Sequence, residues 1–220
     1  MSPTPPKRKR EAARADSFAE SFEDRLDVSR LAPGGLLFGR EAGHRVYKVA
    51  FQSLRRLPKE GVLLVDLSRV RQASNQALKE ALSVVDVLRT AKFEERFILF
   101  LVDERNRDLC ESVEIVARHG GDVLPAVGRG GARIHFGKLT AAERETLKAV
   151  ERYGELTSRE LRERLGLLPS AASNRLRRLH HLRLIRRDER AVSGSGGREF
   201  VYRPLVRPGA RRAAAGRGLK

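Results

Sequence analysis

The residues with the clearest chemical pattern lie between positions 169 and 187. This stretch contains serine, asparagine and arginine but no aspartate or glutamate. Arginine can donate two hydrogen bonds to guanine, and asparagine can pair with adenine in a similar way. At about 100° per residue, a helix would turn Ser170, Asn174 and Arg177 away from its apolar side. The pattern therefore has the chemistry needed to contact base edges and phosphates.

The apolar residues of this stretch recur every three or four positions, which predicts an amphipathic helix. They are Ala172, Leu176, Leu179 and Leu182. The predicted DNA contacts on the other side are Ser170, Ser173, Asn174, Arg175, Arg177 and Arg178. Because residues near the start of a recognition helix reach the bases, we expect the first three and then Arg177 to contact bases. Arg175 and Arg178 are expected to hold phosphates. An ordinary amphipathic surface helix would explain the periodicity but not the missing acidic residues.

Two shorter helices are predicted before this helix. Each begins with a capping box, in which a threonine and the glutamate three residues later satisfy each other's backbone amides. The pairs are Thr140 with Glu143 and Thr157 with Glu160. Residues 166–168 begin with glycine and have the length of the turn in a helix-turn-helix. Pro169 suits the first position of the third helix.

A hairpin is predicted after the third helix. Residues 184–185 and 200–202 resemble strands and flank a Gly/Ser-rich loop at 193–197. Arg190 and Arg198 border this loop, and we predict that they enter the minor groove or contact its phosphates. A flexible hairpin with solvated arginines is the alternative.

The segment from residue 139 to residue 202 resembles the MarR-type and related bacterial winged-helix repressors. The matching positions are Leu161, Leu165, Pro169, Ser170, residues 175–179 and residues 182–185. The resemblance implies a winged helix-turn-helix domain that binds double-stranded DNA. Arg183 departs from the family pattern, which usually has glycine because the turn into the strand favours positive φ. The dimerising helices of that family have no counterpart in the sequence, and a different domain stands in their place.

Residues 36–137 are predicted to form an α/β domain. Apolar spacing at residues 40–57, 74–88 and 108–120 is helical, with Asp108 and Glu111 as the predicted capping pair of the last helix. Short apolar runs predict strands at residues 36–38, 62–65, 97–102, 123–127 and 132–136. Alternating strands and helices are typical of a mostly parallel sheet covered by helices.

The order of these elements, with Asp-Leu-Ser-Arg-Val at residues 66–70 directly before a helix, resembles the STAS fold. It is most similar to the STAS-like domains found beside helix-turn-helix domains in bacteria, over about residues 36–127. In anti-sigma-factor antagonists of this fold, Asp-Ser-Ser-Gly follows the strand and its serine is phosphorylated. The matching positions here, residues 74–77, are Ser-Asn-Gln-Ala, so the resemblance does not extend to that switch. Ser74 is instead predicted to be a helix N-cap.

The sequence suggests no catalytic, cofactor or metal site. The Gly-rich residues 128–131 could hold phosphate, but they do not open a helix, so a hairpin or linker is predicted. The histidines have no acidic residue at ligand spacing. Cys110 is the only cysteine, which excludes an intrachain disulfide. We expect it to be packed, with a redox role as the alternative because a nearby helix N-terminus could lower its pKa.

The charge distribution favours a polyanionic partner for the last third of the chain. The formal net charge is +17. Residues 1–38 have 7 Lys/Arg and 6 Asp/Glu, residues 39–137 have 17 and 13, and residues 138–220 have 21 and 9. No membrane span or signal peptide is recognised, so we expect a cytoplasmic, nucleoid-associated protein.

The sequence thus predicts an α/β STAS-like domain plus an α+β winged helix-turn-helix domain. The predicted parts are a flexible N-terminal segment at 1–35, the STAS-like domain at 36–137, the winged helix at 138–205 and a disordered basic tail at 206–220. The expected function is that of a homodimeric transcription regulator and not of an enzyme, with Val84 and Val87 at one interface. The alternative is an adaptor of the anti-sigma-factor-antagonist type, with the winged helix docking protein or RNA.

Overall fold

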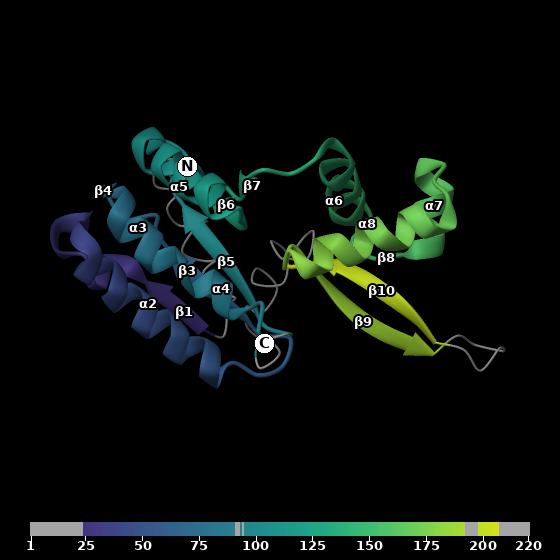
Figure 1. The fold of residues 1–220 in the computed structure, drawn as a ribbon, viewed down its shortest axis with the longest axis horizontal. Helices are drawn as coiled ribbons and strands as arrows, with labels where there is room; N and C mark the ends of the chain where they lie inside the picture. Colours follow the sequence, from purple (N-terminus) through teal and green to yellow (C-terminus); the bar gives the residue numbers. More distant parts are fainter. Residues whose placement is uncertain (1–23, 91–92, 94, 192–197, 207–220) are drawn as a thin grey trace, which may run out of the picture. The chain divides into compact units, whose positions relative to one another are not determined.

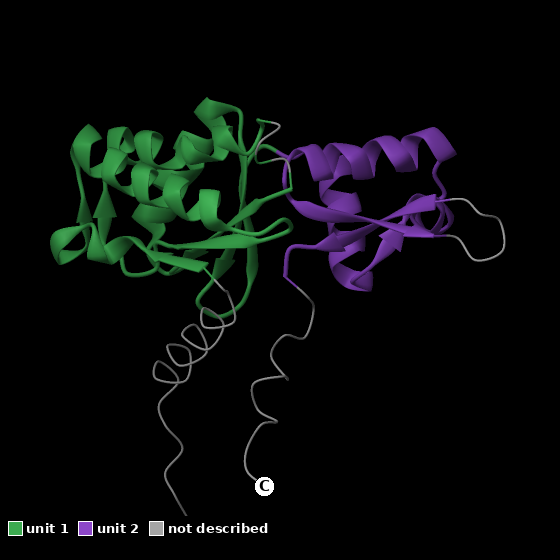
Figure 2. Cartoon of the chain, turned by 90° about the horizontal axis from the view of Figure 1, so that it is seen from below, with its two compact units in different colours: residues 1–138 green, residues 139–220 purple. Residues whose placement is uncertain are grey.

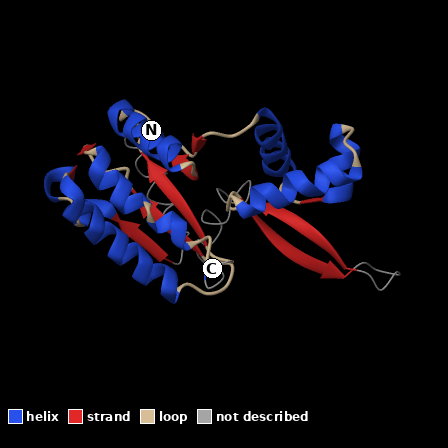
Figure 3. Ribbon diagram, viewed as in Figure 1, coloured by secondary structure: helices blue, strands red, loops and turns tan. Residues whose placement is uncertain are grey.

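The computed structural model describes residues 24–90, 93, 95–191 and 198–206 of the chain (Figure 1). The chain divides into two compact units, unit 1 at residues 1–138 and unit 2 at residues 139–220 (Figure 2). Helices and strands alternate through unit 1, and its central sheet is mostly parallel (Figure 3). The architecture is therefore mixed α/β, as predicted.

The central sheet of unit 1 has five strands in the order β1-β3-β5-β6-β7. They are β1 (Asp24–Asp27), β3 (Val62–Asp66), β5 (Phe97–Val102), β6 (Val123–Gly128) and β7 (Arg133–Gly137). The first four are parallel, and β7 returns antiparallel to β6. A separate small sheet pairs β2 (Leu36–Leu37) with β4 (Gln72–Ala73). The predicted strand at 36–38 thus exists, but it lies outside the central sheet.

The helical segments of unit 1 connect these strands. They are η1 (Val28–Arg30), η2 (Pro33–Gly35), α2 (Gly39–Arg56), α3 (Asn75–Leu82), α4 (Val84–Val87) and α5 (Arg107–Gly120). Parallel neighbours joined in sequence order by right-handed crossovers place their helices on one face of a sheet. Figure 2 shows α2 to α5 in one layer on one side of the strands. The core between the two layers includes Leu63, Val65, Ile98 and Phe100.

Helices α2 and α3 approach each other closely at Gly43. A Cβ atom there would lie 2.2 Å from the carbonyl oxygen of Ala77, so only glycine fits without moving the backbone. At the exposed start of the same contact, Glu80 of α3 accepts from Arg40 and pairs with His44 of α2. The hydrogen bond with His44, followed by that with Arg40, outweighs desolvation and lowers the pKa of Glu80.

The helix caps of unit 1 agree in part with the prediction. Ser74 is the N-cap of α3, as predicted, because its Oγ accepts a hydrogen bond from the amide of Ala77 at 3.2 Å. The prediction for α5 is wrong by two residues. Asn106 is its N-cap and accepts from Leu109, while Asp108 lies within the first turn. An asparagine side chain competes as well as aspartate for this position.

The predicted flexible segment at residues 1–35 is wrong for residues 24–35. Asp24–Asp27 forms β1 and pairs in parallel with β3. Val28 and Ala32 are buried in the core. The sequence of β1 has one apolar residue among three charged ones, so it gives no hydrophobic signal. The strand is held instead by its ladder and by Arg25, which donates to the fully buried Asp66 at 2.5 Å. Residues 1–23 lie outside the described residues.

Val84 and Val87 do not form the exposed interface that was predicted. Val84 is 1% exposed and belongs to the core, and Val87 is half-buried and packs against it. The reason is a break in the predicted helix at Ser83, which separates α3 from α4. The break redirects the valines toward the core.

Unit 2 consists of three helices and a three-stranded antiparallel sheet in the order β8-β10-β9. Its elements are α6 (Ala141–Tyr153), β8 (Leu156–Thr157), α7 (Ser158–Leu165), α8 (Pro169–His181), β9 (Ile185–Ala191) and β10 (Arg198–Pro204). Its core includes Leu147, Leu161, Leu176 and Val201. Within the described residues of the whole chain, no helix is both long and apolar enough to span a membrane.

Candidate nucleic-acid interface

Helices α6 and α7 begin at the two predicted capping boxes. Glu143 donates its amide to Thr140 Oγ1 at 3.2 Å, and its carboxylate accepts from the Thr140 amide at 2.8 Å. Thr157 and Glu160 make the same pair at 3.2 and 2.7 Å. These local bonds fix the start of each helix and thereby the direction in which each helix meets α8.

Helix α8 begins at Pro169, as predicted, after a turn in which Gly166 has a φ of 63°. Its apolar residues Ala172, Leu176 and Leu179 are fully buried against the rest of unit 2. Leu182 follows the helix as its C-cap and is half-buried. This anchoring holds the opposite side of α8 toward solvent.

The predicted base-contacting residues occupy that solvent side. Ser170, Asn174 and Arg177 are exposed, and Ser173 is half-buried on the flank. Within the described residues, no carboxylate lies at ion-pair distance from Arg177. This side of α8 therefore exposes hydroxyl, amide and guanidinium groups, and the guanidinium of Arg177 has no carboxylate partner among the described residues.

Arg175 and Arg178 have a different environment from Arg177. Arg175 donates to Glu145 at 2.8 Å, and Arg178 donates to Glu143 at 3.2 Å. Both glutamates belong to α6, so these arginines connect α8 to α6. Burial alone would raise the pKa of Glu143, but hydrogen bonds from Thr140 and Arg178 lower it. The two predicted phosphate contacts are thus already paired with carboxylates in the free protein.

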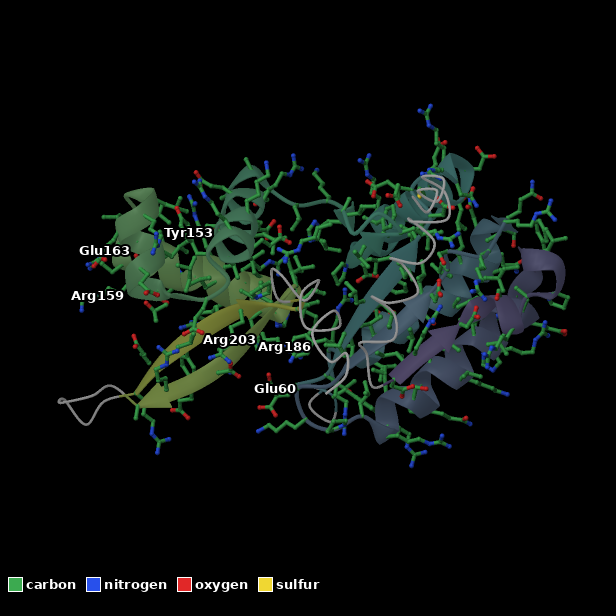
Figure 4. The ribbon with its side chains drawn as sticks, turned by 180° about the vertical axis from the view of Figure 1, so that it is seen from behind. Glu60, Tyr153, Arg159, Glu163, Arg186 and Arg203 are labelled. Carbon is green, nitrogen blue, oxygen red and sulfur yellow. The ribbon has the colours of Figure 1, made fainter. Side chains whose placement is uncertain are left out.

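The arginines of the hairpin are also paired. Arg190 donates to Glu155, and Arg198 donates to Glu189 at 3.3 Å. Arg203 joins the same network through Glu155 at 3.1 Å and Asp188 at 2.9 Å. Burial tends to raise the pKa of Glu155, but Arg190 and Arg203 lower it. Figure 4 labels Arg203 on β10. The loop between the strands, residues 192–197, and residues 207–220 lie outside the described part of the chain.

Arg183 occupies a position that favours glycine, because its φ is 59°. The Arg183 amide donates to the His180 carbonyl at 2.9 Å, and the Leu184 amide donates to the Leu179 carbonyl at 3.1 Å. This pair of bonds is a Schellman motif, which ends a helix at a left-handed residue. Arg183 is 8% exposed, so its side chain is buried while its backbone is strained.

His180 lies on the buried side of α8, next to the apolar stripe. Burial, followed by the positive charges of Arg187, Arg183 and His181, lowers the pKa of His180 to about 4. It is therefore neutral at physiological pH. Sequence periodicity did not single it out, because Leu179 already fills the predicted stripe beside it.

One exposed residue next to the solvent side of α8 was not predicted. Leu168, the N-cap of α8, has 74% of its surface exposed, the largest value among the exposed large apolar residues described. It precedes the exposed Pro169 and Ser170. An apolar side chain placed in the major groove can contact the methyl group of thymine. An apolar residue in the predicted turn at residues 166–168 could have indicated an exposed apolar side chain there.

Helix α7 exposes a further row of charges. Arg159 and Glu163, both labelled in Figure 4, pair across one turn at 3.1 Å. Arg164 lies with its guanidinium carbon 3.9 Å from the centre of the Tyr153 ring, a cation–π contact. The cation–π contact connects α6 to α7. Unlike Arg177, Arg159 has a carboxylate partner.

The remaining candidates in unit 1 have structural roles. Residues 128–131 form the predicted hairpin between β6 and β7, and the amide of Gly130 donates to Glu104. Burial and the nearby Asp103 and Glu104 raise the pKa of Cys110, which contradicts the alternative of a lowered pKa and a redox role. No cluster of metal-binding side chains occurs among the described residues.

Comparison of the chain with protein-family models, with curated proteins and with solved structures finds no match. The chemistry of the described residues is therefore the basis for a function. Within the described part of unit 2, the exposed side of α8 and the arginines of the hairpin form a surface whose chemistry suits a polyanionic ligand.

Proposed function

We propose that this chain is a transcription regulator that binds specific sequences of double-stranded DNA through α8. The main support is the exposed side of α8, where Ser170, Asn174 and Arg177 project and where no described carboxylate lies at ion-pair distance from Arg177. These side chains can pair with base edges in the major groove. Ser173 and Leu168 flank them and extend the contact surface.

We assign unit 2 to the winged helix-turn-helix class. The order α6-β8-α7-α8-β9-β10 and the pairing of β8 with the β9–β10 hairpin are consistent with this class. In such domains the third helix enters the major groove. Arg175, Arg178, Arg190 and Arg198 would contact phosphates by exchanging their present carboxylate partners for phosphate oxygens.

We assign unit 1 to a STAS-like sensing or protein-binding domain, on the basis of its alternating strands and helices. A phosphorylation switch at Ser74 is not part of the proposal, because its Oγ caps α3. We expect a homodimer, since most winged-helix regulators bind paired half-sites. Sedimentation analysis of the full chain tests this expectation.

The test of DNA binding is a mobility shift with duplexes selected from a random pool. Asn174→Ala combined with Arg177→Ala should lower affinity for the selected sequence at least about 30-fold, since each base contact contributes roughly 1–3 kcal/mol. Arg55→Ala combined with Arg56→Ala, which removes two exposed arginines of α2, is the control and should have little effect. Equal binding to all sequences, unchanged in the α8 variant, would refute the proposal.

A salt titration separates phosphate contacts from base contacts. The logarithm of affinity should fall linearly with the logarithm of salt concentration, with a slope of about −0.9 for each phosphate contacted. Selected and unselected duplexes should show similar slopes but different affinities. A stable complex with another protein, without any DNA binding, would instead support the adaptor function.

A further inference from the structure

The arginines of α8 and of the β9–β10 hairpin differ in whether a carboxylate already binds them. Those paired with a glutamate or an aspartate are Arg175, Arg178, Arg190, Arg198 and Arg203. Within the part of unit 2 that the structure describes, Arg177 and Arg187 have no carboxylate at ion-pair distance. Arg187 is a half-buried residue of β9. Its guanidinium, like that of Arg177, can therefore bind an anion without first releasing a carboxylate.

Arg187 is held by two aromatic residues of β10. Side chains alternate along a strand, so Phe200 and Tyr202 lie on one face of the hairpin. Arg187 is opposite Tyr202 in the register of β9 and β10 and shares that face. Its guanidinium carbon lies 4.5 Å from the centre of the Phe200 ring, a cation–π contact, and it donates a hydrogen bond to the Tyr202 hydroxyl. These contacts orient the guanidinium without neutralising its charge.

The two acidic residues that follow Arg187 on β9 have other partners. Asp188 is the next residue, so it points to the opposite face of the hairpin, and it pairs with Arg203 at 2.9 Å. Glu189 shares the face of Arg187, but Arg198 donates to its carboxylate at 3.3 Å. Neither carboxylate therefore competes for Arg187.

The face of the hairpin that carries Arg187 lies beside α8. Helix α8 contacts β9 within unit 2 (Figure 1). Burial raises the pKa of the Tyr202 hydroxyl, and the charges of Arg187 and Arg177 oppose this shift. Burial, followed by the charge of Arg187, lowers the pKa of His180, which lies one turn after Arg177 on α8. The two arginines without a carboxylate partner thus lie close to the same tyrosine.

We propose that Arg187 is a preformed contact for a DNA phosphate and that Phe200 and Tyr202 are its positioning residues. The proposal rests on the proposed function, in which α8 enters the major groove. A helix in that groove has a phosphate backbone on each side, so a guanidinium beside α8 meets phosphate oxygens of the same site. The planar guanidinium can donate two parallel hydrogen bonds to one phosphate.

Arg187 differs from Arg190, on the same strand, in what it must give up to bind phosphate. Arg190 must release Glu155, and the carboxylate left behind repels the incoming phosphate. Arg187 releases no carboxylate. Its half-buried side chain is already ordered by Phe200, so less conformational entropy is lost on binding. We therefore expect Arg187 to contribute more to DNA affinity than Arg190.

The test compares Arg187→Ala with Arg190→Ala in the full chain, by mobility shift over a range of salt concentrations. Arg187→Ala should weaken the binding of selected and unselected duplexes alike, by roughly tenfold, and should reduce the salt slope by about 0.9. Arg190→Ala is the matched control, because it removes the same charge from the same strand, and it should change both quantities less. An effect of Arg190→Ala equal to or larger than that of Arg187→Ala would overturn the proposal.

A double-mutant cycle tests the positioning residues. Phe200→Leu removes the ring that holds Arg187 and should weaken binding about threefold without changing the salt slope, because the arginine remains. Tyr202→Phe removes only the hydroxyl and should act in the same direction. Neither substitution should weaken binding further when Arg187→Ala is already present. Additive losses would overturn the role of these aromatic residues in positioning Arg187.

The outcomes separate this proposal from the function on which it rests. If the unsubstituted chain binds no duplex DNA, both fail. If binding is sequence-specific and depends on Arg177 but is unchanged in Arg187→Ala, only the proposal for Arg187 fails. Thermal melting shows whether each variant is folded. Arg187→Lys keeps the charge and loses the planar guanidinium, so it should keep the salt slope and lose part of the affinity even if Arg187→Ala does not fold.

Discussion

The two units of this protein use their charged residues in different ways. Unit 1 has 25 Lys/Arg and 19 Asp/Glu, whereas unit 2 has 20 and 9. In unit 1 a buried aspartate, Asp66, pairs with Arg25 inside the sheet, and several pairs tie neighbouring elements together. In unit 2 the few acidic residues pair with particular arginines on α7, α8 and the hairpin.

The difference shows which arginines of unit 2 are already paired with carboxylates. Arg175 and Arg178 are paired with α6. Arg190 is paired with Glu155, just before β8, and Arg198 is paired with Glu189 on β9. Arg177 has no carboxylate at ion-pair distance within the described residues. The shortage of acidic residues thus leaves Arg177 as accessible positive charge on the exposed side of α8, where a DNA-binding helix would need it.

The largest expected effect is on the free energy of unfolding and tests whether the two units unfold independently. Leu78→Ala in α3 and Leu176→Ala in α8 each remove a fully buried side chain. Each should destabilise its own unit by roughly 2–5 kcal/mol. Calorimetry should show two unfolding transitions. Leu78→Ala should shift only the transition of unit 1, and Leu176→Ala only that of unit 2. If both transitions move together in either variant, the comparison of two independent units is wrong.

Acid should destabilise unit 2 through His180. Its pKa is about 4 in the folded protein, below the usual value near 6.5, so the unfolded chain binds more protons between these values. Stability is therefore complete above pH 6.5 and falls as the pH decreases toward 4, by at most roughly 3 kcal/mol.

The measurement is chemical denaturation at several pH values. His180→Gln should flatten the acid dependence of unit 2 alone. Burial and the charge of Arg133 also lower the pKa of His135, in unit 1, to about 4. His135→Gln is therefore the matched variant in unit 1. If the unfolding free energy of both units kept the same dependence on pH after these substitutions, the assignment of this dependence to His180 and His135 would be contradicted.

Leu168 should affect sequence preference without affecting stability. Leu168→Ser should lower affinity by about 1 kcal/mol for a duplex with thymine at the contacted position. Replacing that thymine by deoxyuridine should weaken the unsubstituted protein equally but leave the variant unchanged. Leu36→Ser, an exposed leucine of unit 1, is the control. An equal loss for thymine and deoxyuridine in both proteins would exclude a methyl contact.

Freeing a paired arginine should change nonspecific binding by a smaller amount. Glu145→Gln releases Arg175, which should steepen the salt dependence by about one phosphate contact and leave the preferred sequence unchanged. The stability cost should be below about 1 kcal/mol, as for other exposed pairs. Glu41→Gln in α2 is the charge-matched control. A changed sequence preference would show that Arg175 contacts bases.

The smallest effect is expected at the end of α8. Arg183→Gly relieves a left-handed backbone but loses the packing of a buried side chain, so we expect a net change below about 1 kcal/mol. Gly154→Ala, at the left-handed end of α6, has no such offset and should destabilise unit 2 by about 1 kcal/mol. Thermal melting compares the two. A loss above about 2 kcal/mol in Arg183→Gly would mean that side-chain contacts dominate.

The sequence alone determined the features that depend on near neighbours. The capping boxes at Thr140 and Thr157 follow from a threonine and a glutamate three positions apart. The N-cap at Ser74 and the start of α8 at Pro169 follow from the residue type at the helix start. The apolar runs of β3, β5 and β6 were equally clear, since both faces of these strands are buried. Such patterns are local, so their energies can be inferred from spacing without knowing the fold.

Only the tertiary structure decided the features that depend on distant partners. Strand β1 exists because Asp24–Asp27 pairs with β3, although its own sequence is mostly charged. Val84 turns inward because the helix breaks at Ser83. The pairing of Arg175 and Arg178 with α6 requires two helices 30 or more residues apart to pack together. Ladder bonds and ion pairs between distant residues leave no periodic trace in a sequence, because their partners are chosen by packing and not by spacing.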